Sequence, residues 1–199
     1  LYVGGGILKA RAADALRELA ELTGISVVTT LMARGAFPDG HDLCLGMPGM
    51  HGNFTAVTAM QESDLLVALG ARFDDRVTGR TDAFAPGAKK IHIDIDPSSI
   101  NKNIAVDVAV IGDAAKTLAA MNRLWNEKKL KPDAKALKSW WKTIDKWRGI
   151  DCLAYDQDGD GAIKPQYALE TLHKSLADSD YYVTTDVGQH QMWAAQYLR

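Results

Sequence analysis

The chain has 199 residues, of which 47% are hydrophobic and 24% are charged, a composition typical of a folded globular protein. Its 23 Lys and Arg against 25 Asp and Glu give a net charge of −2, which excludes the electrostatic footprint of a nucleic-acid-binding protein. No apolar run approaches the roughly 18 residues of a membrane span. The two cysteines, Cys44 and Cys152, lack the spacing of a metal site or a disulfide framework, which fits a reducing compartment.

The first half of the chain alternates between short apolar segments and helical patterns. Residues 1–3 predict a strand, the glycines 4–6 a turn, and the leucines that follow predict a helix ending near Gly24. The β-branched run 25–31 predicts a second strand. Residues 32–53 are rich in Gly, Pro, His and Met, and we expect a long loop there.

Three further strands follow a helix at about 54–63. They are predicted at 64–69, 90–95 and 106–111, and Gly112 precedes a helix with apolar residues at helical spacing. Five strands alternating with helices predict an α/β fold, in which a parallel sheet with right-handed crossovers is flanked by helices.

The second half of the chain changes character. Residues 131–162 predict a linker that contains a Trp-rich helix, whose apolar face packs on a core or on another domain. Pro165 begins a further helix, Tyr181–Thr185 predicts a strand, and a helix follows Gly188. We therefore expect a domain over 1–130, a linker over 131–162, and the first βα part of a second α/β domain over 163–199. The uncapped ends predict a fragment of a longer polypeptide.

The strongest candidate for a binding site is the loop 70–76, which contains two arginines and two aspartates directly after a buried strand. Parallel sheets bind ligands at the carboxyl ends of their strands. Arginine side chains there suit a diphosphate, and a carboxylate suits sugar hydroxyls. The alternative is that the four charges pair with one another on a solvated loop.

Other candidates end neighbouring strands: the glycine turn, Thr30 with Leu31, Asp94 and Asp113. If these turns converge, they favour a large phosphate-bearing ligand. Each has a simpler alternative. The third glycine of a dinucleotide fingerprint is replaced by Lys9, Asp113 suits a helix N-cap, and Asp94 could simply end a strand.

Two metal-binding patterns are rejected. Residues 156–163 imitate a calcium loop, but Tyr167 replaces the required glutamate and Pro165 interrupts the loop. The segment 159–161 imitates the magnesium motif of thiamine enzymes, but no asparagine follows Asn126. No metal site is predicted. For His51 and His190, a structural role and a ligand contact both stay open.

Taken together, the segments 4–6, 50–52, 72–76, 92–96 and 189–193 resemble acetohydroxyacid synthase (biosynthetic acetolactate synthase), large catalytic subunit. The resemblance implies the Rossmann-like middle domain of a thiamine-diphosphate enzyme and the start of its thiamine-diphosphate domain. It implies a transferase of isoleucine and valine biosynthesis that condenses pyruvate with pyruvate or 2-oxobutyrate. It also implies a cytoplasmic location, or a plastid in a plant.

The resemblance also implies site residues by position. The implied FAD contacts are Gly4, Gly5, Gly6, Thr30, Leu31, Gly49, Met50, His51, Gly70, Arg72, Asp74, Arg76, Val77, Asp94, Ile95 and Asp113. Those for thiamine diphosphate are Val187, Gly188, Gln189 and His190, and the substrate channel is bordered by Met50, Asp75 and Arg76. The flavin has a structural place in this family.

The family's catalytic glutamate and its Mg²⁺ ligands lie outside this sequence, so no catalytic residue is assigned and the 199 residues alone are expected to be inactive. Implied partners are 2-oxo acids, further copies in a dimer or tetramer, and a possible regulatory subunit. Two alternatives stay open: a non-catalytic flavin- or nucleotide-binding module, and a related thiamine enzyme such as a pyruvate oxidase.

Overall fold

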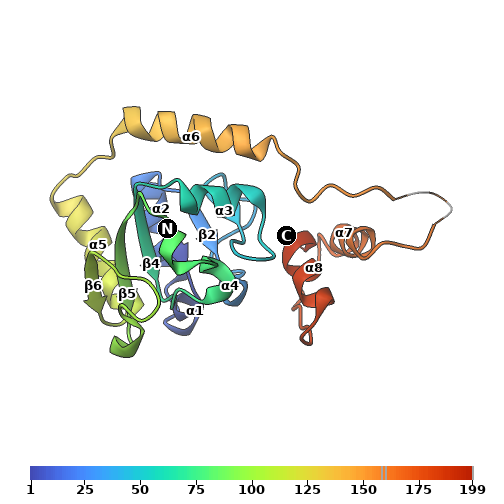
Figure 1. The fold of residues 1–199 in the computed structure, drawn as a ribbon, viewed down its shortest axis with the longest axis horizontal. Coiled ribbons are helices and arrows are strands. Elements are labelled where there is room, and N and C mark those ends of the chain that lie inside the picture. The colour runs from blue at the N-terminus through green and yellow to red at the C-terminus, as the bar shows by residue number, and fades with distance from the viewer. Residues whose placement is uncertain (158, 160, 199) are drawn as a thin grey trace. The chain divides into compact units, whose positions relative to one another are not determined.

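A computed structural model describes residues 1–157, 159 and 161–198. The chain forms two compact units, unit 1 over Leu1–Ile150 and unit 2 over Asp151–Arg199, which are considered separately. Figure 1 shows the order of their elements along the chain.

Unit 1 contains a single sheet among the described residues. Its strands are β1 (Tyr2–Val3), β2 (Val27–Thr29), β3 (Cys44–Gly46), β4 (Leu65–Leu69), β5 (Lys89–Asp94) and β6 (Val108–Ile111). Its α-helices are α1 (Gly6–Lys9), α2 (Ala13–Thr23), α3 (Phe54–Gln61), α4 (Asp75–Thr78), α5 (Ala114–Glu127) and α6 (Ala134–Arg148). Short 3₁₀ turns occur at η1 (Leu31–Ala33), η2 (Thr81–Ala83) and η3 (Pro97–Ser99).

All neighbouring strands are parallel, in the order β3-β2-β1-β4-β5-β6. This is the strand order of a doubly wound dinucleotide-binding sheet. After β1 the strands are added on one side, as β2 and β3, and then on the other side, as β4, β5 and β6, so the order reverses between β1 and β4. The predicted parallel α/β fold is therefore confirmed.

Helices cover both faces of the sheet, as the continuous apolar strands require. On one face, Ile7 of α1, Leu16 of α2 and Leu118 of α5 pack on Val3 and Leu69. The other face carries a second core cluster, whose members include Tyr2, Ala56, Met60, Ala68, Phe73, Phe84 and Ile144. The two faces thus divide the helices into two layers.

The stretch 32–53, for which the sequence predicts a loop, contains a strand, β3. Strand β3 has only three residues and follows no alternating pattern. It exists because Cys44 and Gly46 pair with Val27 and Val28 of β2. The sheet therefore has six strands where five were predicted.

Helix α6 packs on the rest of unit 1 through contacts with residues that are distant in sequence. Ile144 is fully buried against the second core cluster, and α6 contacts α3. The indole nitrogen of Trp141 donates to the Gly24 carbonyl oxygen at 3.0 Å, and Arg148 donates to the Asp42 carbonyl oxygen at 2.6 Å. Figure 1 shows α6 running past α2 and α3. The predicted domain limits themselves stay a prediction.

Unit 2 contains helices α7 (Pro165–Ser175) and α8 (Gln189–Tyr197), which pack on each other. The predicted strand over Tyr181–Thr185 is wrong for this structure, since those residues form no strand and Tyr182 is 95% exposed. A strand needs a neighbour for its ladder, and the described residues of unit 2 provide none. Residues 158 and 160 of the calcium-like segment lie outside the described residues.

Among the described residues, no helix combines the length and the apolar character that crossing a membrane requires.

We expect Ile144→Ala to lower the free energy of unfolding of unit 1 by about 2–5 kcal/mol, because it removes a fully buried side chain and leaves a cavity. Urea unfolding followed by tryptophan fluorescence measures the change. Lys142→Ala on the exposed side of the same helix is the control and should change stability by no more than about 0.5 kcal/mol. Equal stability of both variants would show that α6 does not contribute to the core.

Candidate functional site

The turns that follow the six strands share one edge of the sheet, because all strands are parallel. Gly4, Gly5 and Gly6 follow β1; Thr30 and Leu31 follow β2; Gly49, Met50 and His51 follow β3; Gly70, Arg72, Asp74, Arg76 and Val77 follow β4; Asp94 and Ile95 end β5; and Asp113 follows β6. All of these except Gly4 are at least partly exposed. The geometric condition for a shared binding site at the carboxyl edge is therefore met.

Backbone hydrogen bonds continue the sheet into these turns. The first residue after a strand donates its amide to the last residues of the neighbouring strand, at 2.8 or 2.9 Å in each case: Thr30 to Val3, Gly4 to Leu69, Gly70 to Ile93, and Gly112 to Asp94. The starts of four turns are thereby fixed relative to one another before any side chain is considered.

The closest approach lies between β1 and β4, where the strand order reverses. A Cβ on Gly4 would lie 2.6 Å from the Ala71 Cα, and one on Gly6 would lie 2.7 Å from the Gly70 Cα. Gly70 itself has φ +58°, a left-handed conformation that favours glycine. The glycine turn is thus required by backbone packing, whether or not a ligand binds.

In the arginine loop, residues 70–76, the two arginines have different surroundings. The Arg72 guanidinium donates to Asp74 at 2.6 Å, with 75% of the Arg72 side chain exposed. The hydrogen bond from the Arg76 backbone amide lowers the pKa of Asp74, and the hydrogen bond from the Arg72 side chain lowers it further. Among the residues that the structure describes, the Arg76 guanidinium makes no ion pair. The alternative of mutual pairing therefore holds for Arg72 and Asp74 but leaves Arg76 available for an anion.

Phe73 anchors the arginine loop in the core. It is 1% exposed and has φ 52°, which is unusual for a bulky residue and marks a constrained turn. Its ring packs on Tyr2, Phe84 and His92, with centroids 5.5, 6.0 and 5.0 Å away. Asn103 donates to the Phe73 carbonyl oxygen at 2.9 Å. These contacts hold the two arginines at the edge of the sheet.

A second contact joins the arginine loop to the loop after β3. Gly49 has φ +100°, and a Cβ there would lie 2.6 Å from the Arg76 carbonyl oxygen. That carbonyl oxygen accepts a hydrogen bond of 2.8 Å from the Met50 amide. Gly49, Met50 and Arg76 are therefore brought together, as the sequence analysis expected for residues of one site.

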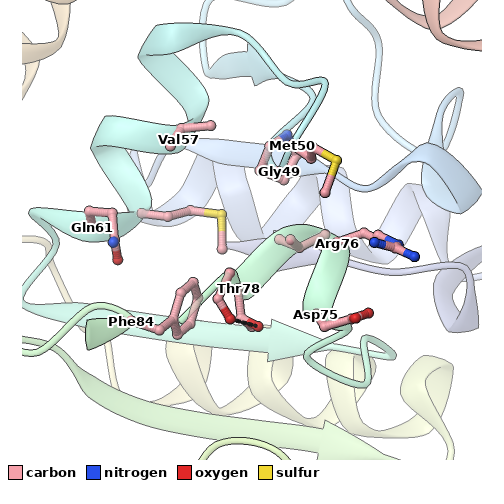
Figure 2. A pocket seen from close by; sticks show the side chains of 12 residues that line it. Gly49, Met50, Val57, Gln61, Asp75, Arg76, Thr78 and Phe84 are labelled. Atoms are coloured by element: carbon pink, nitrogen blue, oxygen red, sulfur yellow. Dashed lines mark hydrogen bonds between the residues drawn. The ribbon is translucent and has the colours of Figure 1, made fainter. Parts of the chain in front are cut away.

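A partly open cavity of about 340 Å³ lies beside these residues. Figure 2 shows Met50, Asp75 and Arg76 at one end of it and Gln61 and Phe84 at the other. The wall is largely apolar, and the Arg76 side chain points away from the Gln61 end. An apolar wall with an arginine on its rim can receive a small organic anion, although the Asp75 carboxylate at the same end offsets part of the positive charge.

Two residues that shape this site were not singled out from sequence. Gln61 accepts a hydrogen bond of 2.6 Å from the Ala85 amide and so holds the segment carrying Phe84 against α3. Asn103 holds the arginine loop from a connection thirty residues away. No local pattern marks either residue, because their partners are backbone groups chosen by the tertiary fold.

The β2–β3 connection is fixed by an ion pair that the sequence analysis did not identify. The Arg34 and Asp39 side chains, 17% and 20% exposed, pair at 2.7 Å. Arg34 also donates to the hydroxyl of Thr29 at 3.3 Å, at the end of β2. A partly buried Arg–carboxylate pair restricts this long connection, which carries Thr30 and Leu31 at its start.

Asp94 and Asp113 both have the structural roles offered as alternatives. Asp113 Oδ1 accepts from the Lys116 amide at 2.9 Å and caps α5. Asp94 Oδ1 accepts from the Asp96 amide at 2.9 Å. Each carboxylate uses one oxygen in these bonds, so a contact between the other oxygen and a ligand is compatible with the structural role.

In unit 2, the four candidate residues lie at the start of α8. Gly188 is the N-cap of the helix, Gln189 and His190 are its first residues, and Val187 is 85% exposed.

Among the described residues of the whole chain, no three metal-ligating side chains are grouped to hold a metal ion.

Residues 1–121 match the family described as the central domain of thiamine pyrophosphate (thiamine diphosphate) enzymes. The chain belongs to this family. The matched range covers the six strands and most of α5, and thus the entire edge that carries the candidate residues.

The whole chain, both the central domain and the segment that follows it, is similar to acetolactate synthases. The acetolactate synthase of Mycobacterium bovis is 51% identical over 199 residues, which is 100% of this chain and 32% of that protein. Acetolactate synthase isozyme 3 large subunit of Escherichia coli is 43% identical over 197 residues, 99% of this chain and 34% of that protein. The chain thus spans about a third of the length of these relatives.

We expect Gly4→Ala to lower the free energy of unfolding by about 3 kcal/mol, because the new Cβ would collide with the backbone after β4. Chemical denaturation measures the loss. Gly40→Ala is a matched control, since a Cβ there meets nothing within 4 Å. If Gly4→Ala and Gly40→Ala proved equally stable, the two turns would not be in the contact described.

Proposed function

We propose that the chain is part of the large catalytic subunit of an acetolactate synthase-type transferase. In this proposal the complete enzyme condenses pyruvate with pyruvate or 2-oxobutyrate to acetohydroxyacids for isoleucine and valine synthesis. The observation that carries the proposal is Arg76 at the carboxyl edge, whose guanidinium makes no ion pair with any described residue and which is held beside Met50 and a cavity that suits a small organic anion. The similarity to acetolactate synthases over the whole chain supports it.

We propose that unit 1 binds FAD along the carboxyl edge of the sheet. The turn at Gly4–Gly6 has no side chains to block the approach of a diphosphate. Arg76 supplies a guanidinium that has no ion-pair partner in the described part of the chain, and Asp94 retains an oxygen for a ribose hydroxyl. In this role the residues of the chain bind and orient the flavin, whose place is structural.

We propose that Val187, Gly188, Gln189 and His190 contact the phosphate end of thiamine diphosphate. The exposed start of α8 fits this role, because the first amides of a helix lack partners within the helix. Thiamine diphosphate supplies the carbanion chemistry of the reaction when it is bound. The Mg²⁺ ligands and the catalytic glutamate are proposed to lie in other parts of the polypeptide.

For the substrate, we propose that Met50, Asp75 and Arg76 border the channel through which a 2-oxo acid passes. Arg76 attracts and orients the carboxylate, while Met50 limits access by water. We further propose a homo-oligomer in the cytoplasm, or in a plastid if the source is a plant, with a possible regulatory subunit.

We expect Arg76→Ala to weaken FAD binding by about 1.5–3 kcal/mol, the range for a hydrogen bond to a charged group. Arg72→Ala should also weaken it, but by less, because Arg72 is already paired with Asp74. Fluorescence titration of the 199-residue chain with FAD measures both changes.

Arg80→Ala is the control for the two arginine variants. Arg80 is equally exposed and pairs with Asp82 at 2.6 Å, but it follows α4 rather than the strand end. Its affinity for FAD should match that of the wild type. Unchanged affinity in Arg76→Ala, or an absence of binding by the wild-type chain, would contradict the proposed FAD site.

A further inference from the structure

His92 is a completely buried histidine that none of the roles above uses. It lies on β5 with its side chain 0% exposed, in register with Ala68 of β4 and Ala109 of β6. Small side chains on both neighbouring strands leave room for the imidazole ring. The ring meets Phe73 edge to face, with centroids 5.0 Å apart.

Neither ring nitrogen of His92 reaches a partner at hydrogen-bond distance within the part of the chain that the structure describes, and the acceptors near enough to raise its pKa against the effect of burial are the Asp94 carboxylate and the Ala71 carbonyl oxygen. Buried polar groups are nearly always hydrogen-bonded, because leaving one unsatisfied costs the desolvation of that group. A buried histidine with two unsatisfied nitrogens in a strand that ends at the candidate site therefore calls for an explanation.

The nearest charged group to the His92 ring is Asp94. Residues two apart on a strand face the same side, and His92 Nε2 lies 3.7 Å from Asp94 Oδ2. Burial lowers the pKa of His92, so the ring is neutral at neutral pH and carries one N–H. A movement of less than about 1 Å would let that N–H donate to the carboxylate.

The two oxygens of Asp94 have different neighbours. Oδ1 already accepts from the Asp96 amide at 2.9 Å, and Oδ2 is the oxygen that faces His92. If His92 donates to Oδ2, both oxygens are held and the plane of the carboxylate is set. Each carboxylate oxygen can accept more than one hydrogen bond, so the outward lone pairs stay available to a ligand.

We propose that His92 is a positioning residue for ribose recognition: its Nε2–H orients the Asp94 carboxylate so that Asp94 can accept hydrogen bonds from the hydroxyls of an adenosine ribose. The inference rests on the proposed binding of FAD. Because the ring also packs on Phe73, His92 touches both the ribose-binding strand end and the arginine loop. It thus sets the two contacts relative to each other.

The test compares ADP with 2′,3′-dideoxy-ADP by calorimetry on the wild-type chain and three variants. We expect the wild type to prefer ADP by about tenfold, as for one hydrogen bond to a charged group. His92→Phe keeps the ring volume but removes the N–H, so the preference should fall below about twofold while affinity for the dideoxy compound is retained. His92→Gln places an amide donor at similar reach and should restore the preference.

Asp94→Asn is the third variant, and it keeps the test decisive if His92→Phe does not fold. It should lose the preference for ribose as His92→Phe does. Persistence of a tenfold preference in His92→Phe or in Asp94→Asn would overturn the inference, and so would a failure of His92→Gln to restore it. If the wild-type chain bound neither FAD nor ADP, the proposed function itself would fail, which separates the two outcomes.

Discussion

The backbone contact between the turn after β1 and the exit from β4 is the constraint on which the candidate site depends. Gly4 donates to Leu69, Gly6 donates to Gly70, and neither glycine leaves room for a Cβ. This contact lies where the strand order reverses, which is the place where open parallel sheets bind ligands. The glycines bring the two turns together at this point.

Aromatic packing fixes the position of the arginine loop, which carries the charged residues. Phe73 is buried on the same face of the sheet as Tyr2, Phe84 and His92, so the arginine loop starts from a rigid position. The loop after β3 then joins it through the hydrogen bond from Met50 to Arg76. An exposed arginine on a well-fixed backbone loses less conformational freedom on binding than one on a mobile loop.

The partly or fully buried polar groups beside the site have different roles. The Arg34–Asp39 pair restrains the connection between β2 and β3, and Gln61 restrains the segment that carries Phe84. Both side chains find their partners within the fold. The fully buried His92, by contrast, makes no hydrogen bond through its ring nitrogens among the residues that the structure describes, although it lies next to Asp94.

The sequence by itself determined the parallel α/β fold, five of the strands, and the turns that follow them, because apolar runs and glycines are local signals with direct physical meaning. It also yielded the resemblance that the family match confirms. Only the tertiary structure decided the rest. Strand β3 depends on pairing with β2, the predicted strand over Tyr181–Thr185 has no neighbour among the described residues, and α6 is held by carbonyl groups more than a hundred residues away. Among the described residues, Arg72 pairs with Asp74, whereas Arg76 makes no ion pair and the His92 ring makes no hydrogen bond. The sequence did not reveal these differences, because partners are determined by proximity in space rather than by spacing along the chain.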